Sequence, residues 1–143
     1  MRTLILIVAA AAALCLASAT MASERSAPTL AAKSSRFGKV LFDSRGFVVY
    51  AFTKDRHRSA CSGECAKKWP PYVVRGRVRA GTGLKASLLG TVRRADGSRQ
   101  VTYAGRPLYY YVGDTKPGQI LCQNASEFGG LWLIVRPSGK LVR

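Results

Sequence analysis

Apolar residues beyond about position 37 occur in short runs separated by turn-forming residues, a pattern typical of β-strands joined in hairpins. The stretch VLFDSRGFVVYAF has an apolar run on each side of residues 43–46, and TVRRADGSRQVTY repeats this arrangement around Asp96-Gly97. An Asp-Gly pair between strands favours a type I′ turn. Further turns are predicted at residues 104–107 and 137–140, with strands at 108–111 and 131–135.

Two stretches fit a short helix better than a strand. Residues 61–68 (CSGECAKK) stop just before Pro70-Pro71, and residues 84–89 (LKASLL) follow a glycine-rich loop. The sequence therefore predicts a mainly β fold with one or two short helices.

The segments YAFTKD (50–55) and YYYVGD (109–114) share one skeleton of Tyr, an aromatic residue and Asp. A shift of 59 residues superposes Gly46, Tyr50, Phe52 and Asp55 on Gly105, Tyr109, Tyr111 and Asp114. Two copies with unequal downstream spacing argue against a solenoid. We expect a single compact domain over residues 37–143, built from two diverged β-hairpin repeats at about 37–74 and 91–143 that share one core.

The N-terminus has the build of a secretory signal peptide. Arg2 precedes an apolar run from Leu4 to Leu16, which is short for a membrane span. The small residues that follow predict a signal peptide over residues 1–19, cleaved after Ala19, with Ala22 as the second choice. We therefore expect a secreted or cell-envelope protein with no transmembrane helix after cleavage.

Two further features of the N-terminal region affect this picture. Cys15 follows Leu14 rather than a small residue, so the sequence does not predict a lipid-attachment site and Cys15 leaves with the signal peptide. Residues 20–36 mix Ser, Ala, Thr and Pro without periodicity, which predicts a flexible linker before a fold that begins near Phe37.

The chain is strongly basic, with 23 Lys and Arg against 7 Asp and Glu and a net charge of +16. Such a charge favours association with polyanions, although it also serves solubility alone. For an exported protein the candidate partners are anionic envelope polymers and lipid headgroups, and no motif predicts specific nucleic-acid binding. Arg75, Arg77 and Arg79 alternate, so they would line one face of a strand, or else belong to a solvated loop.

Several stretches together resemble a known family, the secreted proteins and lipoproteins with a Yx(FWY)xxD motif called the secreted repeat of unknown function. The similarity covers about Phe37 to Arg143 and includes both motif copies. It also includes CSGECAKKWPP (61–71), VTYAGRPLYYYVGD (101–114) and EFGGLWLIV (127–135). The resemblance implies export and a repeat architecture, and it implies no established chemistry.

The repeated motif has a structural interpretation and a chemical one. In a strand, Tyr50 and Phe52 point to the same face, and Asp55 then falls where a carboxylate can accept backbone N–H groups and fix a turn. The second copy, Tyr109, Tyr111 and Asp114, is expected to behave alike. The alternative is that Asp55 and Asp114 face each other as a cation site or an acid/base pair.

Three cysteines remain after cleavage, in a compartment that favours disulfides: Cys61, Cys65 and Cys122. Closing the short loop between Cys61 and Cys65 stabilises by roughly 2 kcal/mol, and a link to Cys122 by roughly 4 kcal/mol, so the residues alone leave the pairing open. The resemblance places the C-x3-C pair within the pattern of the first repeat. It therefore implies a Cys61–Cys65 disulfide and leaves Cys122 as a free thiol or an intermolecular link.

A metal or thiol-redox site is the alternative from a different functional class. His57, Cys61 and Cys65 have helical spacing, and Cys122 would complete a four-ligand site for zinc or copper. No nucleophile elbow or P-loop is present, so the sequence predicts no enzyme and no cofactor. Trp69 and Trp132 lie in or beside apolar runs and are expected in the core rather than on a glycan-binding surface.

Overall fold

The structure is a computed structural model that describes residues 29–143. The signal peptide predicted over residues 1–19, its cleavage after Ala19 and the first part of the predicted linker lie outside the described residues. Within residues 29–143, no helix is long and apolar enough to cross a membrane.

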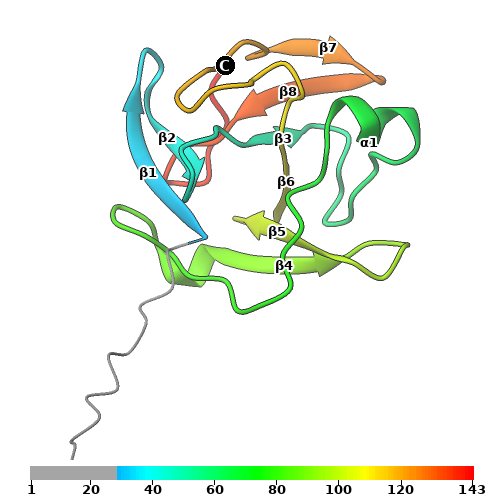
Figure 1. Ribbon diagram of the computed structural model, residues 1–143, viewed down its shortest axis with the longest axis horizontal. Coiled ribbons are helices and arrows are strands. Elements are labelled where there is room, and N and C mark those ends of the chain that lie inside the picture. Colours follow the sequence, from blue (N-terminus) through cyan, green and yellow to red (C-terminus); the bar gives the residue numbers. More distant parts are fainter. Residues whose placement is uncertain (1–28) are drawn as a thin grey trace, which may run out of the picture.

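The described chain folds into two antiparallel sheets, which confirms the mainly β class (Figure 1). One sheet pairs β1 (Leu30–Ser35) with β2 (Gly38–Asp43). The other has the order β4-β5-β6-β3-β8-β7. Its strands are β3 (Tyr50–Phe52), β4 (Leu89–Arg93), β5 (Arg99–Tyr103), β6 (Arg106–Tyr109), β7 (Ala125–Glu127) and β8 (Gly130–Ile134).

Strand β1 corrects the predicted extent of the linker. The sequence predicts a flexible lead up to residue 36, whereas residues 30–35 pair along their whole length with β2. Ala, Lys and Ser have weak strand preferences, so no local pattern marks this segment. The strand forms because Leu30 is fully buried and the backbone finds hydrogen-bond partners in β2.

The helix predictions are met at reduced length. Helix α1 covers Glu64–Lys68, inside the predicted 61–68, and ends before Pro70-Pro71. The second predicted helix is a single 3-10 turn, η1 (Ala86–Leu88), inside the predicted 84–89.

The predicted hairpins form, with a different distribution of turn types. Between β4 and β5 only Gly97 takes a positive φ (82°), and Gly97 N–H donates to the Arg94 carbonyl at 3.0 Å. This is a three-residue loop and not the predicted type I′ turn. The type I′ geometry occurs between β5 and β6, where Ala104 (φ 50°) and Gly105 (φ 73°) are both left-handed. The Asp-Gly pair alone did not specify the turn type, because the loop length depends on where the two strands stop pairing.

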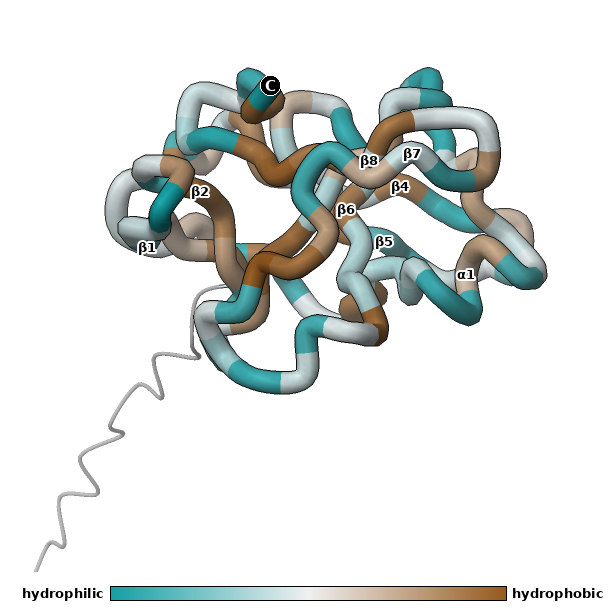
Figure 2. The backbone as a smooth tube through the Cα atoms, turned by 90° about the horizontal axis from the view of Figure 1, so that it is seen from above, coloured by the Kyte–Doolittle hydropathy of each residue, from teal (hydrophilic) through white to brown (hydrophobic). Residues whose placement is uncertain are grey.

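The two motif strands are neighbours at the centre of the larger sheet. Strand β3 pairs antiparallel with β6 so that Tyr50 lies opposite Tyr109. On its other side β3 pairs with β8, which places Phe52 opposite Trp132. The most hydrophobic stretches of backbone run through the middle of the molecule, and the outer loops are mostly hydrophilic (Figure 2). The buried side chains form two hydrophobic clusters, and each cluster contains residues from both repeats.

Aromatic side chains from both repeats build one of these clusters. Trp69 and Trp132 are fully buried and their rings stack in parallel at 4.0 Å. The motif tyrosines meet them edge-on, Tyr50 against Trp69 at 5.2 Å and Tyr109 against Trp132 at 5.1 Å. Both tryptophans are core residues, as expected.

Candidate functional site

The motif residues form a reciprocal connection between the two repeats. The hydroxyl of Tyr50 donates to Asp114 Oδ2 at 2.6 Å, and the hydroxyl of Tyr109 donates to Asp55 Oδ2 at 2.8 Å. Burial raises the pKa of both tyrosines, so the hydroxyls stay protonated and act as donors. Each repeat thus supplies the tyrosine for the other repeat's carboxylate.

The second oxygen of each carboxylate fixes the loop that follows the motif. Asp55 Oδ1 accepts the N–H of Ala60 at 2.7 Å, and Asp114 Oδ1 accepts the N–H of Leu121 at 2.9 Å. Both oxygens of each motif aspartate are therefore occupied by protein donors. This arrangement suits a turn-fixing role better than an acid/base pair, which needs an oxygen directed at a substrate.

The remaining motif aromatics are exchanged in the same way. Phe52 of the first repeat stacks on Trp132 of the second at 4.2 Å, and Tyr111 of the second packs on Trp69 of the first at 4.9 Å. The two copies of the motif are thus related by an approximate twofold axis between β3 and β6.

The pH dependence of stability is expected to reflect the motif carboxyls. Burial outweighs the hydrogen bonds and raises the pKa of Asp55 and Asp114 above the ordinary value of 3.8. The folded state then binds protons more readily than the unfolded state, so these groups add stability as pH falls through the raised pKa. Urea unfolding at neutral pH and at about pH 4 measures this effect. The difference in free energy of unfolding between wild type and Asp114→Asn should shift in favour of wild type at the lower pH.

The opposite trend would show that the hydrogen bonds dominate at Asp114. Glu127 contributes in the opposite direction, since its bond from Lys68 lowers its pKa. Because Glu127 is present in both proteins, its contribution cancels in the comparison.

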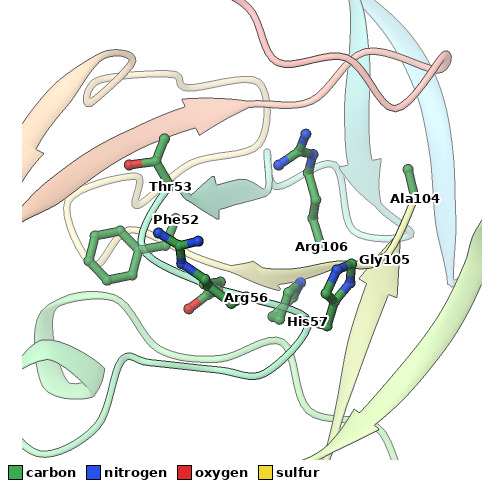
Figure 3. A pocket seen from close by; sticks show the side chains of 9 residues that line it. Phe52, Thr53, Arg56, His57, Ala104, Gly105 and Arg106 are labelled. Atoms are coloured by element: carbon green, nitrogen blue, oxygen red, sulfur yellow. The ribbon is translucent and has the colours of Figure 1, made fainter.

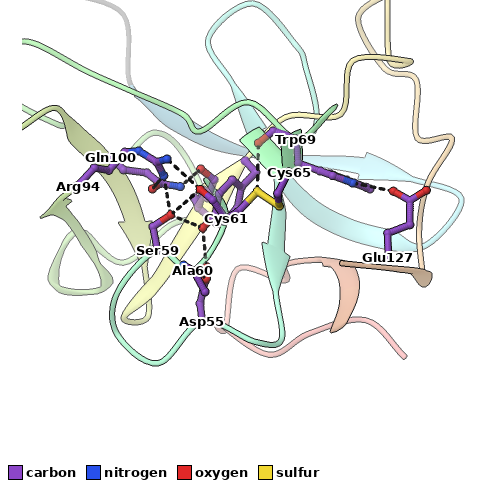
Figure 4. The surroundings of a disulfide bond; sticks show 11 residues. Asp55, Ser59, Ala60, Cys61, Cys65, Trp69, Arg94, Gln100 and Glu127 are labelled. Carbon is purple, nitrogen blue, oxygen red and sulfur yellow. Dashed lines mark hydrogen bonds between the residues drawn. A yellow bond between two sulfur atoms is a disulfide. The ribbon is translucent and has the colours of Figure 1, made fainter. Parts of the chain in front are cut away.

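Two polar residues that sequence reasoning missed support the loop after β3, residues 53–60, which we call the first motif loop (Figure 4). The Oγ of Ser59 lies 2.7 Å from the Tyr109 hydroxyl and accepts a hydrogen bond from Arg94. Arg94 also donates to the carbonyl of Cys61 at 2.9 Å and to Gln100 Oε1 at 2.8 Å. No local pattern could have found them, because Arg94 reaches the loop from the distant β4–β5 hairpin.

The cysteines follow the pairing that the resemblance implies. Cys61 and Cys65 form a disulfide with a Cα–Cα distance of 5.2 Å, and Cys122 is a free, partly exposed thiol. Two of the four ligands proposed for zinc or copper are thereby bonded to each other. Among residues 29–143 no group of three His, Cys, Asp or Glu side chains is arranged to hold a metal ion. His57, the fourth proposed ligand, lies beside the turn at Gly105.

A cleft of about 680 Å³ opens between the loop after β3 and the β5–β6 turn (Figure 3). The loop contributes Arg56 and His57, and the opposite side contributes Arg106 at the start of β6. The full lining is Phe52, Thr53, Asp55, Arg56, His57, Ala104, Gly105, Arg106 and Pro107. Sequence reasoning singled out His57 for a metal site and missed both arginines, since only the fold brings them to one cavity.

The cleft is cationic because its arginines have no acidic partners. In residues 29–143 the ion pairs join Arg45 to Asp43, Lys67 to Glu64 and Lys68 to Glu127. Asp55 is the only carboxylate in the lining, and its oxygens accept hydrogen bonds from Tyr109 and Ala60. The guanidinium groups of Arg56 and Arg106 therefore remain available to an anion.

The alternating arginines noted in the sequence do not form a strand face. Arg75, Arg77 and Arg79 lie exposed in the loop between α1 and η1. The N–H of Arg79 donates to Thr29 Oγ1 at 2.9 Å, which ties this loop to the beginning of β1. The solvated-loop interpretation is the one that the structure supports.

Comparison with known proteins gives one match. The sequence model of a family described as a secreted repeat of unknown function matches residues 31–72 and 90–136. The two matched segments contain β3 and β6, the strands that carry the two motif tyrosines. No curated protein and no solved structure matches the chain.

Proposed function

The chain belongs to the secreted repeats of unknown function, and from this premise we propose that it is an exported, non-enzymatic module that binds anionic partners of the cell envelope. The partners are anionic polymers or lipid headgroups. The double motif serves as the frame that holds the two repeats together, and the basic surface provides the binding.

The excess of unneutralised cations is the observation that supports this proposal. The sequence has 23 Lys and Arg against 7 Asp and Glu. Among residues 29–143, the ion pairs involve Arg45, Lys67 and Lys68. The other described acidic side chains do not form ion pairs. Asp55 and Asp114 accept hydrogen bonds from tyrosines, and Asp96 accepts one from Ser98 in its own turn. A surface with so little internal compensation attracts polyanions.

The motif chemistry supports a role without catalysis. Both carboxylate oxygens of Asp55 and of Asp114 accept hydrogen bonds from the protein, and the Tyr50 hydroxyl donates a hydrogen bond to Asp114. The disulfide removes Cys61 and Cys65 as nucleophiles.

Binding to defined membranes and polymers tests the proposal. The exported protein should sediment with vesicles that contain phosphatidylglycerol, or bind a soluble polyphosphate, and it should ignore pure phosphatidylcholine vesicles. Each basic residue near an anionic surface contributes about 1 kcal/mol, so the affinity should fall at least tenfold as salt is raised. An absence of salt-dependent binding to both anionic probes would contradict the proposal.

A further inference from the structure

We propose that the cleft between the first motif loop and the β5–β6 turn is a specific site for the phosphate group of a phosphate ester. This inference rests on the proposed function and narrows it, since it assigns one place on a broadly basic protein to one anionic group.

The equivalent loop and turn on the other side of the motif strands show that this fold does not require an open cleft between them. By the 59-residue shift, the turn at Gly105 corresponds to Gly46, and the loop after Asp55 corresponds to the loop after Asp114. The loop after Asp114 in the second repeat closes on the turn at Gly46 in the first repeat: Gly118 N–H donates to the Gly46 carbonyl at 2.9 Å, and Pro117 packs against Gly46.

The equivalent closure, between the loop after Asp55 and the turn at Gly105, is missing. Within the described chain, no backbone hydrogen bond joins residues 55–60 to the turn at 104–107. The His57 imidazole reaches the turn, and its Nδ1 lies 3.5 Å from where a Cβ on Gly105 would be. The two equivalent loop-and-turn pairs therefore differ, and the open pair is the one that carries Arg56, His57 and Arg106.

The cations of the cleft suit a phosphate better than a single carboxylate. Arg56 and Arg106 approach the cavity from two separate elements, as Figure 3 shows. A guanidinium group offers paired, planar donors to phosphate oxygens, and two of them match the several oxygens and the charge of a phosphate ester. His57 adds a ring nitrogen from the same loop as Arg56.

The site is built on a rigid base. Phe52 is 3% exposed and stacks on Trp132, and the bond from Ala60 N–H to Asp55 closes the loop behind Arg56. His57 has a left-handed backbone (φ 63°), a conformation that is uncommon for a non-glycine residue. Such strain persists where the surrounding contacts hold it, and it often accompanies a binding function.

The size of the cleft indicates that the phosphate carries an attached group. A volume of about 680 Å³ exceeds the need of a bare anion and lies within the range of small-molecule sites. Ala104 and Pro107 supply apolar lining for the carbon atoms of that group. Glycerol phosphate has this chemistry, whether it is part of a lipid headgroup or of a polymer.

Titration of the exported protein with glycerol 3-phosphate is the direct test. We expect saturable binding by calorimetry, with the largest amide shifts in NMR spectra at His57 and Gly105. The double variant Arg56→Gln/Arg106→Gln should bind about 100-fold more weakly, roughly tenfold for each charge-assisted contact. Arg58→Gln removes the same charge from the same loop outside the cleft and should stay within about twofold of wild type.

The variants also test the geometry and the fold. Arg106→Lys keeps the charge but loses the planar fork, so it should weaken binding several-fold. All three arginines are exposed, so the variants should keep the wild-type circular dichroism and unfolding midpoint. Equal affinity of the double variant and Arg58→Gln would overturn the phosphate site.

Two further arms identify the source of the phosphate ester. Glycerol 3-phosphate should compete with phosphatidylglycerol vesicles if the ligand is a lipid headgroup, and with a soluble glycerol phosphate polymer if it is a polymer; competition with either supports the site. Salt-dependent binding to both that glycerol 3-phosphate leaves unchanged would overturn the site and preserve the proposed function. If the protein binds neither the vesicles nor the polymer, both the phosphate site and the proposed function are overturned.

Discussion

Trp132→Ala is expected to lower the free energy of unfolding by about 4 kcal/mol, the range of large-to-small changes at buried aromatic residues. The Trp132 ring lies between Trp69 and Phe52 and meets Tyr109 edge-on, so its removal opens a cavity that both repeats line. Urea unfolding followed by far-ultraviolet circular dichroism measures the change without relying on tryptophan fluorescence.

A matched pair of conservative variants separates packing from hydrogen bonding. The Nε1 of Trp132 is buried and has no partner, whereas the Nε1 of Trp69 donates to Glu127 Oε2 at 2.9 Å. Trp69→Phe should therefore cost about 1–2 kcal/mol more than Trp132→Phe, because it also removes a hydrogen bond to a charged group. A loss below about 1 kcal/mol for Trp132→Ala would show that the stacked core does not hold the repeats together.

Asp114→Ala is expected to destabilise the protein by about 3 kcal/mol. Asp114 is 6% exposed, and its removal leaves the Tyr50 hydroxyl and the Leu121 N–H without their partner. Unpaired buried donors cost more than the hydrogen bonds themselves contribute. Chemical denaturation of the variant measures the loss.

A double-mutant cycle checks that the loss passes through the bond between the repeats. Tyr50→Phe combined with Asp114→Ala should show a coupling energy of about 1–2 kcal/mol, because the two side chains share one 2.6 Å hydrogen bond. Tyr50→Phe with Asp55→Ala is the control, since Asp55 binds Tyr109 instead. Additive effects in both cycles would contradict the reciprocal arrangement.

The candidate site divides into a part that the sequence predicted and a part that it did not. The spacing of Tyr50, Phe52 and Asp55 predicts aromatic packing and a turn at the end of the strand, because side-chain direction and turn chemistry are local properties. The cleft depends on Arg106 lying across from Arg56, some 50 positions away in the chain. Exposed arginines occur throughout this sequence, so no pattern distinguished these two.

The sequence by itself determined the β class, the hairpins, the duplication and the residues available for a disulfide, because alternation, turn residues and spacing act over a few positions. Tertiary structure alone decided that Leu30–Ser35 is a strand, since its pairing with β2 and the burial of Leu30 outweigh weak local preferences. It also decided that each motif aspartate binds the tyrosine of the other repeat. That exchange follows from the antiparallel register of Tyr50 against Tyr109, and a register between distant strands is set by the packing of the whole core.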